Sequence, residues 1–274
     1  MPSYPIYQID AFASQAFEGN QAGVMPLEAG FLPDDVMQAI AAENNVAETA
    51  FIVPQGEGVW ALRWFTPTVE VPLCGHATLA SAYVLYEHLG FQGDQIIFET
   101  RHSGALRVRK ESGGYLQMDF PASPIQEIEV TDDVVAALGG RPVRAWGGSF
   151  YAAMYESVDA VQSLAPDLKA LSIIGTAGDQ WARGNFGCFA LGGEESADVT
   201  SRFFAPGSGI DEDPATGSWH CMLTPVASSL LEKPALKCRQ AFPGRGAWIG
   251  TELAGDRVKL RGQAVTVIEG VMTL

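Results

Sequence analysis

The sequence predicts an α+β protein made of two similar halves, each a barrel-like sheet curled around one central buried helix. Three observations support this fold class: an internal repeat at about half the chain length, short strands joined by glycine-rich turns, and one helix in each half that is apolar on every side. The 274 residues are 47% hydrophobic and 18% charged, which gives enough apolar side chains to fill two cores.

A strand motif carries the repeat. Residues 63–67 are Arg-Trp-Phe-Thr-Pro and residues 202–206 are Arg-Phe-Phe-Ala-Pro, an offset of 139 residues. A shared period of this size indicates duplication. Continued without a gap, the offset places Cys74 opposite Asp213, and a slip of one residue after the proline would shift that pairing.

The first half is expected to contain several short strands and an early helix. The strands are predicted at residues 4–12, 59–65, 95–99, 105–110 and 115–120. The helix begins at Pro33 and is expected to end at the Asn44-Asn45 pair, because asparagine tolerates the left-handed backbone of a C-terminal cap.

Two further helices, at about residues 77–89 and 218–232, have apolar residues on every side. We expect Pro225 to kink the second one. A helix without a polar face must be buried all round, and a sheet curled about it is the simplest way to bury it.

The predicted domains are residues 1–124 and 125–274, with the boundary in the loop at 122–125. The last strand, at about 263–274, is expected to cross back and pack in the first half. With one buried helix in each half, the functional site is expected in the cleft between them.

Charge and composition exclude several classes of protein. Lys and Arg number 17 against 32 Asp and Glu, a formal charge of −15. Such a field repels phosphate backbones and anionic lipid, so we expect neither nucleic acid nor membrane as a partner. No apolar run approaches the ~20 residues that span a bilayer. Four cysteines without a C-x-x-C pair fit reduced thiols, so a cytoplasmic location is predicted.

Glu48 is the first candidate for chemistry. In an alternating strand it shares a face with Val46, Ala50 and Ile52, as the only ionisable group there. Burial would raise the pKa of its carboxyl group toward neutral pH, as general acid/base catalysis requires. The alternative is a solvated or ion-paired glutamate at the end of a strand.

A second candidate is the loop that ends in Cys74-Gly75-His76, just before the first apolar helix. Gly75 allows backbone N–H groups to approach a ligand, and a helix N-terminus favours an anion. His76 could donate or shuttle a proton, or simply cap the helix. Cys74 is interpreted as a packing residue, because the repeat offers Asp213 and no second thiol for a two-base mechanism.

The corresponding loop of the second half holds Asp213, Thr216, Gly217 and Ser218. Its acidic residues could merely cap the helix, while its N–H groups and hydroxyls could bind a small carboxylate. The Gly19-Asn20 turn, with Asn20, could line the same cleft or only turn the chain.

Several cofactor motifs are missing. The sequence has no G-x-G-x-x-G, no Walker loop and no G-x-S-x-G, and its four histidines offer no metal-ligand spacing. We therefore expect chemistry without a cofactor or a metal.

Five motifs stand out when the chain is taken as a whole. They are Asp10-Ala-Phe, Gly19-Asn20, Asn45-Val-Ala-Glu48-Thr, Phe65-Thr-Pro67 followed by Leu73-Cys-Gly-His-Ala-Thr-Leu-Ala80, and Glu212-Asp-Pro-Ala-Thr-Gly-Ser218. In combination they resemble the PhzF (phenazine biosynthesis protein) family from residue 4 to the C-terminal strand. The resemblance implies a diaminopimelate-epimerase-like fold and a homodimer.

The resemblance also implies roles for individual residues. The glutamate matched by Glu48 moves a proton on a ring substrate of the phenazine enzyme without a cofactor. Residues matching His76, Asp213 and Ser218 line that site, and those matching Gly75 and Gly217 contribute N–H groups. The residues beside the Gly-His pair differ from the phenazine enzyme, so the substrate is left open.

The main prediction is thus a cofactor-independent isomerase. Glu48 would transfer the proton, Asp213 and His76 would orient the substrate, and Asn20, Gly75, Thr216, Gly217 and Ser218 would bind it. One alternative is an amino-acid epimerase or racemase that uses Cys74 with Asp213. The other is a non-catalytic protein that binds a metabolite.

Overall fold

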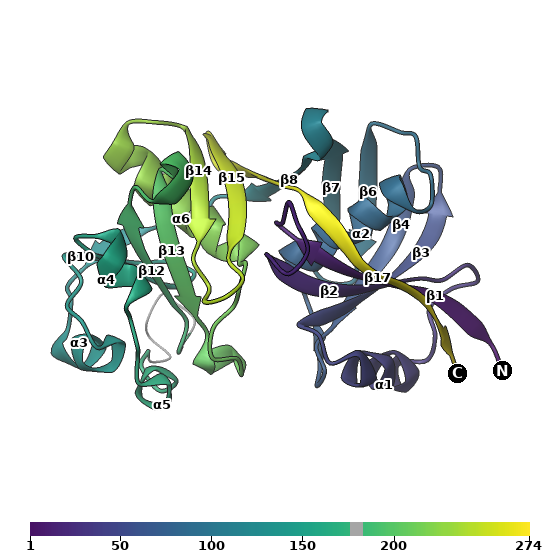
Figure 1. Cartoon of the computed structure of the whole chain (residues 1–274), viewed down its shortest axis with the longest axis horizontal. Helices are drawn as coiled ribbons and strands as arrows, with labels where there is room; N and C mark the ends of the chain where they lie inside the picture. The colour runs from purple at the N-terminus through teal and green to yellow at the C-terminus, as the bar shows by residue number, and fades with distance from the viewer. Residues whose placement is uncertain (176–182) are drawn as a thin grey trace. The chain divides into compact units, whose positions relative to one another are not determined.

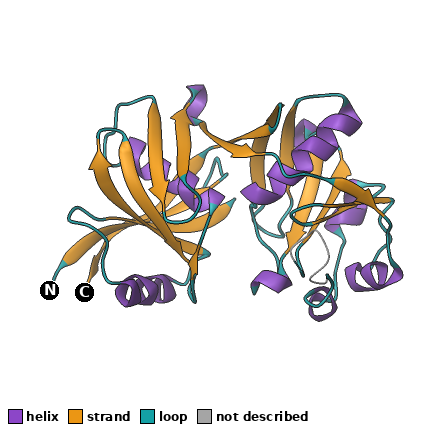
Figure 2. Cartoon of the chain, turned by 180° about the vertical axis from the view of Figure 1, so that it is seen from behind, coloured by secondary structure: helices purple, strands orange, loops and turns teal. Residues whose placement is uncertain are grey.

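The computed structural model describes residues 1–175 and 183–274 (Figures 1 and 2). The chain divides into two compact units. The first comprises Met1–Asp119 with Arg261–Leu274, and the second comprises Phe120–Leu260. The sequence predicts a boundary between residues 124 and 125 and a last strand that packs in the first half. In the structure the last strand pairs with the first strand of the chain.

The first unit is built on a curled sheet with the strand order β17-β1-β2-β3-β4-β6-β7-β8. The short β5 extends one side of β4. The strands are β1 Ser3–Ala11, β2 Asn20–Pro26, β3 Glu48–Gly56, β4 Val59–Phe65, β5 Glu70–Val71, β6 Gln95–Thr100, β7 Ala105–Lys110, β8 Leu116–Pro121 and β17 Ala264–Thr273. Helix α1 spans Asp34–Asn44, helix α2 spans Gly75–Glu87, and a 3-10 turn lies at Ser112–Gly114.

The second unit has a sheet with the order β9-β10-β11-β12-β13-β14-β15. Its strands are β9 Gln126–Ile128, β10 Arg144–Gly147, β11 Tyr151–Met154, β12 Phe186–Leu191, β13 Val199–Phe204, β14 Ala235–Gln240 and β15 Ala247–Ala254, followed by β16 Arg257–Gly262. Its helices are α3 Asp132–Leu138, α4 Val158–Gln162, α5 Leu168–Leu171 and α6 Gly217–Leu231, with 3-10 turns at Glu194–Ser196 and Pro206–Ser208.

The two sheets follow the same sequence of pairings. In the first unit β1–β2 is antiparallel, β2–β3 parallel, β3–β4 antiparallel, β4–β6 parallel and β6–β7 antiparallel. The pairs β10–β11, β11–β12, β12–β13, β13–β14 and β14–β15 repeat that alternation. Both long apolar helices lie between equivalent strands, α2 before β6 and α6 before β14. The repeat seen in the sequence is therefore a repeat of topology.

Helices α2 and α6 are almost entirely buried, as their composition predicts. Helix α2 packs against β1, β2, β3 and β17, and α6 packs against β12, β14 and β15. Their bounds differ from the predicted ones by one or two residues. Helix α6 continues through Pro225 without interruption.

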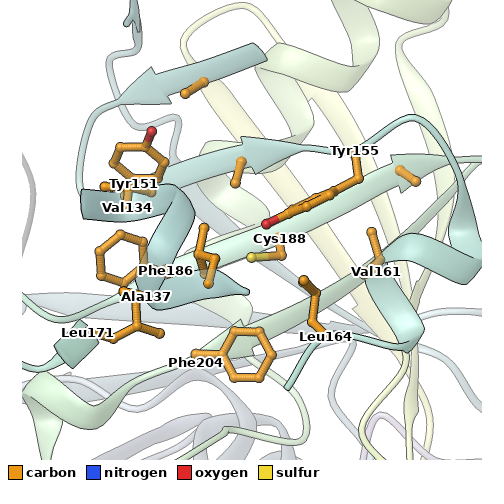
Figure 3. Packing of buried hydrophobic residues seen from close by; sticks show 14 residues of the cluster. Val134, Ala137, Tyr151, Tyr155, Val161, Leu164, Leu171, Phe186, Cys188 and Phe204 are labelled. Carbon is orange, nitrogen blue, oxygen red and sulfur yellow. The ribbon is translucent and has the colours of Figure 1, made fainter. Parts of the chain in front are cut away.

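Strand β12 separates two cores of the second unit. Phe186 and Cys188 face a cluster covered by α3, α4 and α5, which Figure 3 shows. Phe189 faces the cluster around Trp219 of α6. This alternation follows from the two-residue period of a strand, and it explains why the strand is apolar on both faces.

No helix in the described part of the chain is long and apolar enough to cross a membrane. All four cysteines are buried and none forms a disulfide.

Candidate active site

Three of the predicted site residues, Asn20, Glu48 and His76, come together in the first unit, and Cys74, interpreted from the sequence as a packing residue, lies beside them. Helix α1 ends where Asn45 takes the left-handed conformation (φ 48°), as predicted, and β3 begins three residues later at Glu48. Asn20 begins β2, which runs parallel to β3. Cys74 is the N-cap of α2, and His76 lies in its first turn. The ends of three elements therefore bring these side chains to one place.

His76 is the centre of this cluster. Its Nε2 lies 2.9 Å from Oε2 of Glu48, and its Nδ1 lies 3.2 Å from Nδ2 of Asn20. The Cys74 sulfur lies 3.5 Å from Nδ1 and 3.9 Å from Nε2. His76 is only 6% exposed and Cys74 7%, whereas the Glu48 side chain is 18% exposed. The carboxylate is thus the member of the cluster that a substrate reaches most easily.

The contact between His76 and Glu48 is close but poorly aligned. Although the two atoms are 2.9 Å apart, no hydrogen bond with proper geometry reaches Oε2 of Glu48 from the described residues. We therefore treat the contact as an ion pair. It leaves a buried carboxylate oxygen with capacity to accept a proton or a hydrogen bond.

The pKa of Glu48 is set by opposing effects. Burial raises it, but the charge of His76 and the contacts of His76 and Cys74 outweigh burial and hold the pKa below its ordinary value. The prediction that burial raises the pKa of this carboxyl group toward neutral pH is therefore wrong. It considered the strand alone, and β3 starts only at Glu48, so Val46 lies outside it.

The charge of Glu48 affects the pKa of His76, which in turn bears on the orientation of the Asn20 amide. Burial lowers the pKa of His76, whereas the Cys74 sulfur and the Glu48 carboxylate raise it, and the net pKa is well above 6.5. An imidazolium carries hydrogen on both nitrogens. The structure has Nδ2 of Asn20 facing Nδ1, and a half-turn of the amide would bring its oxygen to that position, where it can accept from the imidazolium.

The predicted residues of the second unit form a separate cluster. Thr216 donates from Oγ1 to Oδ2 of Asp213 over 2.6 Å. Gln240 accepts from the Thr216 amide and donates to the Asp213 carbonyl, at 2.9 and 2.6 Å. Gly217 is buried at the start of α6, while Ser218 is exposed.

Gln240 is a site residue that sequence reasoning missed. It is fully buried and fixes both ends of the Asp213–Thr216 segment. A signal was present in the sequence. In the alternating strand Ala235–Gln240, the buried face holds Leu236, Cys238 and Gln240, so a polar residue stands where an apolar one is expected.

The structure also corrects the register of the repeat. Helix α2 begins at Gly75 and α6 at Gly217, an offset of 142 residues, whereas the strand motifs are 139 apart. Three extra residues in the second loop account for the difference. Cys74 therefore corresponds to Thr216 and not to Asp213, because both are the N-caps of equivalent helices.

Among the residues that the structure describes, neither of the two long apolar helices has a side-chain cap at its N-terminus. Neither N-cap side chain accepts a hydrogen bond from its helix, and neither first turn contains an acidic residue, in the ranges that the structure describes. Such a terminus favours an anionic group. The sequence also predicts that a loop at residues 179–186 shapes the site, and residues 179–182 of that loop lie outside the described ranges.

Comparison with known proteins shows to which family the chain belongs. A family model described as phenazine biosynthesis-like protein, PhzC-PhzF, matches residues 9–270. The chain belongs to this family. An uncharacterized isomerase of Pseudomonas aeruginosa is 43% identical over 269 residues, with 98% of each chain covered. The phenazine biosynthesis-like domain-containing protein of Homo sapiens is 36% identical, with 98% of this chain and 99% of the relative covered.

Solved structures agree with the assignment to the PhzC-PhzF family. A PhzF family protein from Enterococcus faecalis is 38% identical and superposes with a TM-score of 0.92 over all of both chains. A predicted epimerase from Pseudomonas aeruginosa, 22% identical over 99% of each chain with a TM-score of 0.68, shares the fold. The predicted family and epimerase-like fold are confirmed. Several relatives are named isomerases, and the chain is an isomerase, as predicted.

Proposed function

We propose that this PhzF-like isomerase moves a proton between two positions of one small carboxylate-bearing molecule, with Glu48 as the general acid/base and without a cofactor. The Glu48 carboxylate takes a proton from carbon and becomes the neutral acid. The neutral acid then returns that proton to another carbon, so substrate and product have the same composition. The observation that supports this proposal best is the buried contact of 2.9 Å between His76 and Glu48.

The neighbours of Glu48 suit this role. His76 keeps the pKa of Glu48 low, so the carboxylate is ionised and can accept a proton, although it is a weaker base than burial alone would make it. His76 is in turn held by Asn20, which limits the positions that both side chains can take. The first-turn amides of α2, beginning at Gly75, would bind the anionic group of the substrate.

Residues of the second unit would bind substrate as the family resemblance implies. Asp213 is fixed by Thr216 and Gln240 and would orient a polar group. The amides of Gly217 and Ser218, at the start of α6, would bind negative charge. Substitution of Asp213 by asparagine keeps the size of the side chain and tests that role separately.

The alternative, an epimerase that uses Cys74 with Asp213, has less support. Burial raises the pKa of Cys74 to about 11, so the thiolate is scarce at neutral pH. The residue equivalent to Cys74 in the second unit is Thr216, so the repeat does not supply a second thiol.

Deuterium incorporation tests the proposal directly. Small cyclic and amino carboxylates are incubated with the protein in D₂O, and wash-in at carbon is followed by NMR. Glu48→Gln should abolish wash-in, whereas Glu57→Gln, an exposed glutamate just after β3, should keep it. Normal wash-in by folded Glu48→Gln would reject Glu48 as the base. Carboxylate binding without any wash-in would instead favour a metabolite-binding protein.

We also propose that the protein is a homodimer in the cytoplasm. The family resemblance suggests the dimer, and four unbridged thiols fit a reducing compartment. Sedimentation velocity of the purified chain measures the oligomeric state.

A further inference from the structure

Three different ligand atoms converge beside the proposed base. One sulfur, one imidazole nitrogen and one carboxylate oxygen, from Cys74, His76 and Glu48, all lie within 4.8 Å of one another. The sequence shows no metal-ligand spacing, because Glu48 and Cys74 lie on separate elements, β3 and the N-cap of α2. Only the fold brings these donors together.

The donor set suits a soft divalent cation. Zn²⁺ binds cysteine sulfur at about 2.3 Å and histidine nitrogen or carboxylate oxygen at about 2.0–2.2 Å, in tetrahedral sites. These bond lengths place neighbouring ligand atoms about 3.3–3.6 Å apart. The measured separations are 3.9 Å from the Cys74 sulfur to Nε2 and 2.9 Å from Nε2 to the Glu48 oxygen. Both separations are within a few tenths of an ångström of these values, and the Cys74 sulfur and the Glu48 oxygen, which lie within 4.8 Å of each other, would approach by up to about 1.2 Å when the cation binds.

The surroundings provide the support that such a site needs. A histidine that binds zinc through Nε2 carries its hydrogen on Nδ1 and donates it to a nearby oxygen. The Asn20 amide lies 3.2 Å from Nδ1 and can present its oxygen there. Oε2 of Glu48 is buried, while the Glu48 side chain as a whole is 18% exposed, so a fourth ligand such as water would enter from the exposed part of that side chain.

The charges of the ligand side chains favour a cation, although the N-terminus of α2 opposes one. The N-terminus of α2 opposes a cation with about half a positive charge. Cation binding releases two protons to solvent, one from the Cys74 thiol and one from Nε2 of His76, and Cys74 and Glu48 then supply two negative charges. The formal charge of −15 also concentrates cations around the protein.

We propose that Cys74, His76 and Glu48 form a binding site for Zn²⁺ or a similar soft divalent cation, and that the bound ion inhibits the isomerase. The inhibitory part rests on the proposed function, because the ion would occupy the oxygen of Glu48 and the nitrogen of His76 that proton transfer uses. Substrate and cation would then compete for one place in the first unit.

Zinc titration of the chelator-treated protein tests the site without any substrate. The wild type should bind one Zn²⁺ per chain, measured by competition with a chromogenic chelator. Cys74→Ser and Glu48→Gln should each weaken binding about tenfold or more. Cys221→Ser, which removes another buried thiol, should bind as the wild type does. Equal affinity of wild type and Cys74→Ser would overturn the proposal, and circular dichroism checks that each variant is folded.

Cobalt provides a second, spectroscopic measurement. Co²⁺ bound through a thiolate gives a sulfur-to-metal charge-transfer band, which should appear in the wild type and in Cys221→Ser and be lost in Cys74→Ser. Absence of the band from the wild type would show that Cys74 is not a ligand and would reject the site.

The two proposals fail in different ways. If zinc does not bind, wash-in in the presence of chelator still tests Glu48 as the base. If zinc binds, one equivalent should stop the wash-in of any substrate that the screen identifies, and a chelator should restore it. Full wash-in by the zinc-loaded protein would overturn the inhibitory part alone.

Discussion

Arg63 and Glu70 form a two-bond ion pair five residues ahead of α2, with N–O distances of 2.7 Å for both bonds. Arg202 and Glu212 repeat the pair at 2.8 and 2.7 Å, five residues ahead of α6. Each arginine is buried on a strand, and each glutamate lies between that strand and the helix, Glu70 in the short strand β5 and Glu212 in a loop. In each unit the pair therefore ties the segment that precedes the helix to a buried strand.

Substitution of Glu70 by glutamine should destabilise the protein. It removes a charged acceptor from Arg63, which is only 5% exposed and whose remaining ion pair is with the exposed Asp34. We expect a loss of about 1 to 3 kcal/mol in the free energy of unfolding. Glu127→Gln, which breaks a similar pair with Arg144 on the surface, should change almost nothing. Urea denaturation measures both, and equal effects would contradict a stabilising role for the buried pair.

Substitution of Gly187 by alanine should disturb the packing of α6. A Cβ atom there would lie 2.4 Å from the ring of Trp219, which is fully buried and has no space to move. We expect a cost of about 1–3 kcal/mol, seen as a lower melting temperature. Gly270→Ala is the matched control, because its Cβ meets open space. If both variants melt like the wild type, the helix is not packed as tightly as the structure shows.

Local patterns predicted the fold well. The repeat of Arg63 and Arg202 located equivalent strands, and the apolar composition of the two helices identified them as central and buried. The Asn45 cap was also predicted correctly, because a left-handed residue is a local property of the backbone. These features depend on neighbours in the sequence.

Tertiary contacts account for what sequence reasoning missed. The pKa of Glu48 depends on His76, which is distant in sequence and approaches only when α2 packs against the sheet. The correspondence of Cys74 with Thr216 depends on three extra loop residues that a fixed offset cannot detect. Gln240 joins Asp213 through hydrogen bonds between separate elements.

His76→Gln should slow proton transfer strongly. The variant removes the positive charge that keeps Glu48 ionised and positioned, so wash-in of deuterium into an identified substrate should fall by about 100-fold or more. His88→Gln is the control, because His88 is a partly buried histidine of the same unit that contacts Thr266 instead. An equal fall in both variants would indicate general damage to the first unit rather than loss of a site residue.

His220 should make the stability of the protein depend on pH between about 6.5 and 4. It is fully buried in α6, donates from Nδ1 to the Thr216 carbonyl over 2.9 Å, and its Nε2 meets no hydrogen-bond donor among the described residues. Burial lowers its pKa to about 4. Below pH 6.5 this histidine is protonated in the unfolded chain but stays neutral in the folded chain. The free energy of unfolding therefore falls as the pH falls, and the decrease ends near pH 4, where the folded chain binds the proton as well.

The loss from His220 alone should approach about 3 kcal/mol at pH 4, because a shift of one pKa unit corresponds to about 1.4 kcal/mol. In His220→Asn the amide can still donate to Thr216 but does not titrate, so its stability should fall less between pH 6.5 and 4. His102→Asn removes an exposed imidazole and should follow the wild-type profile. Urea denaturation at several pH values gives the three curves, and parallel curves for the wild type and His220→Asn would show that His220 does not cause the acid sensitivity.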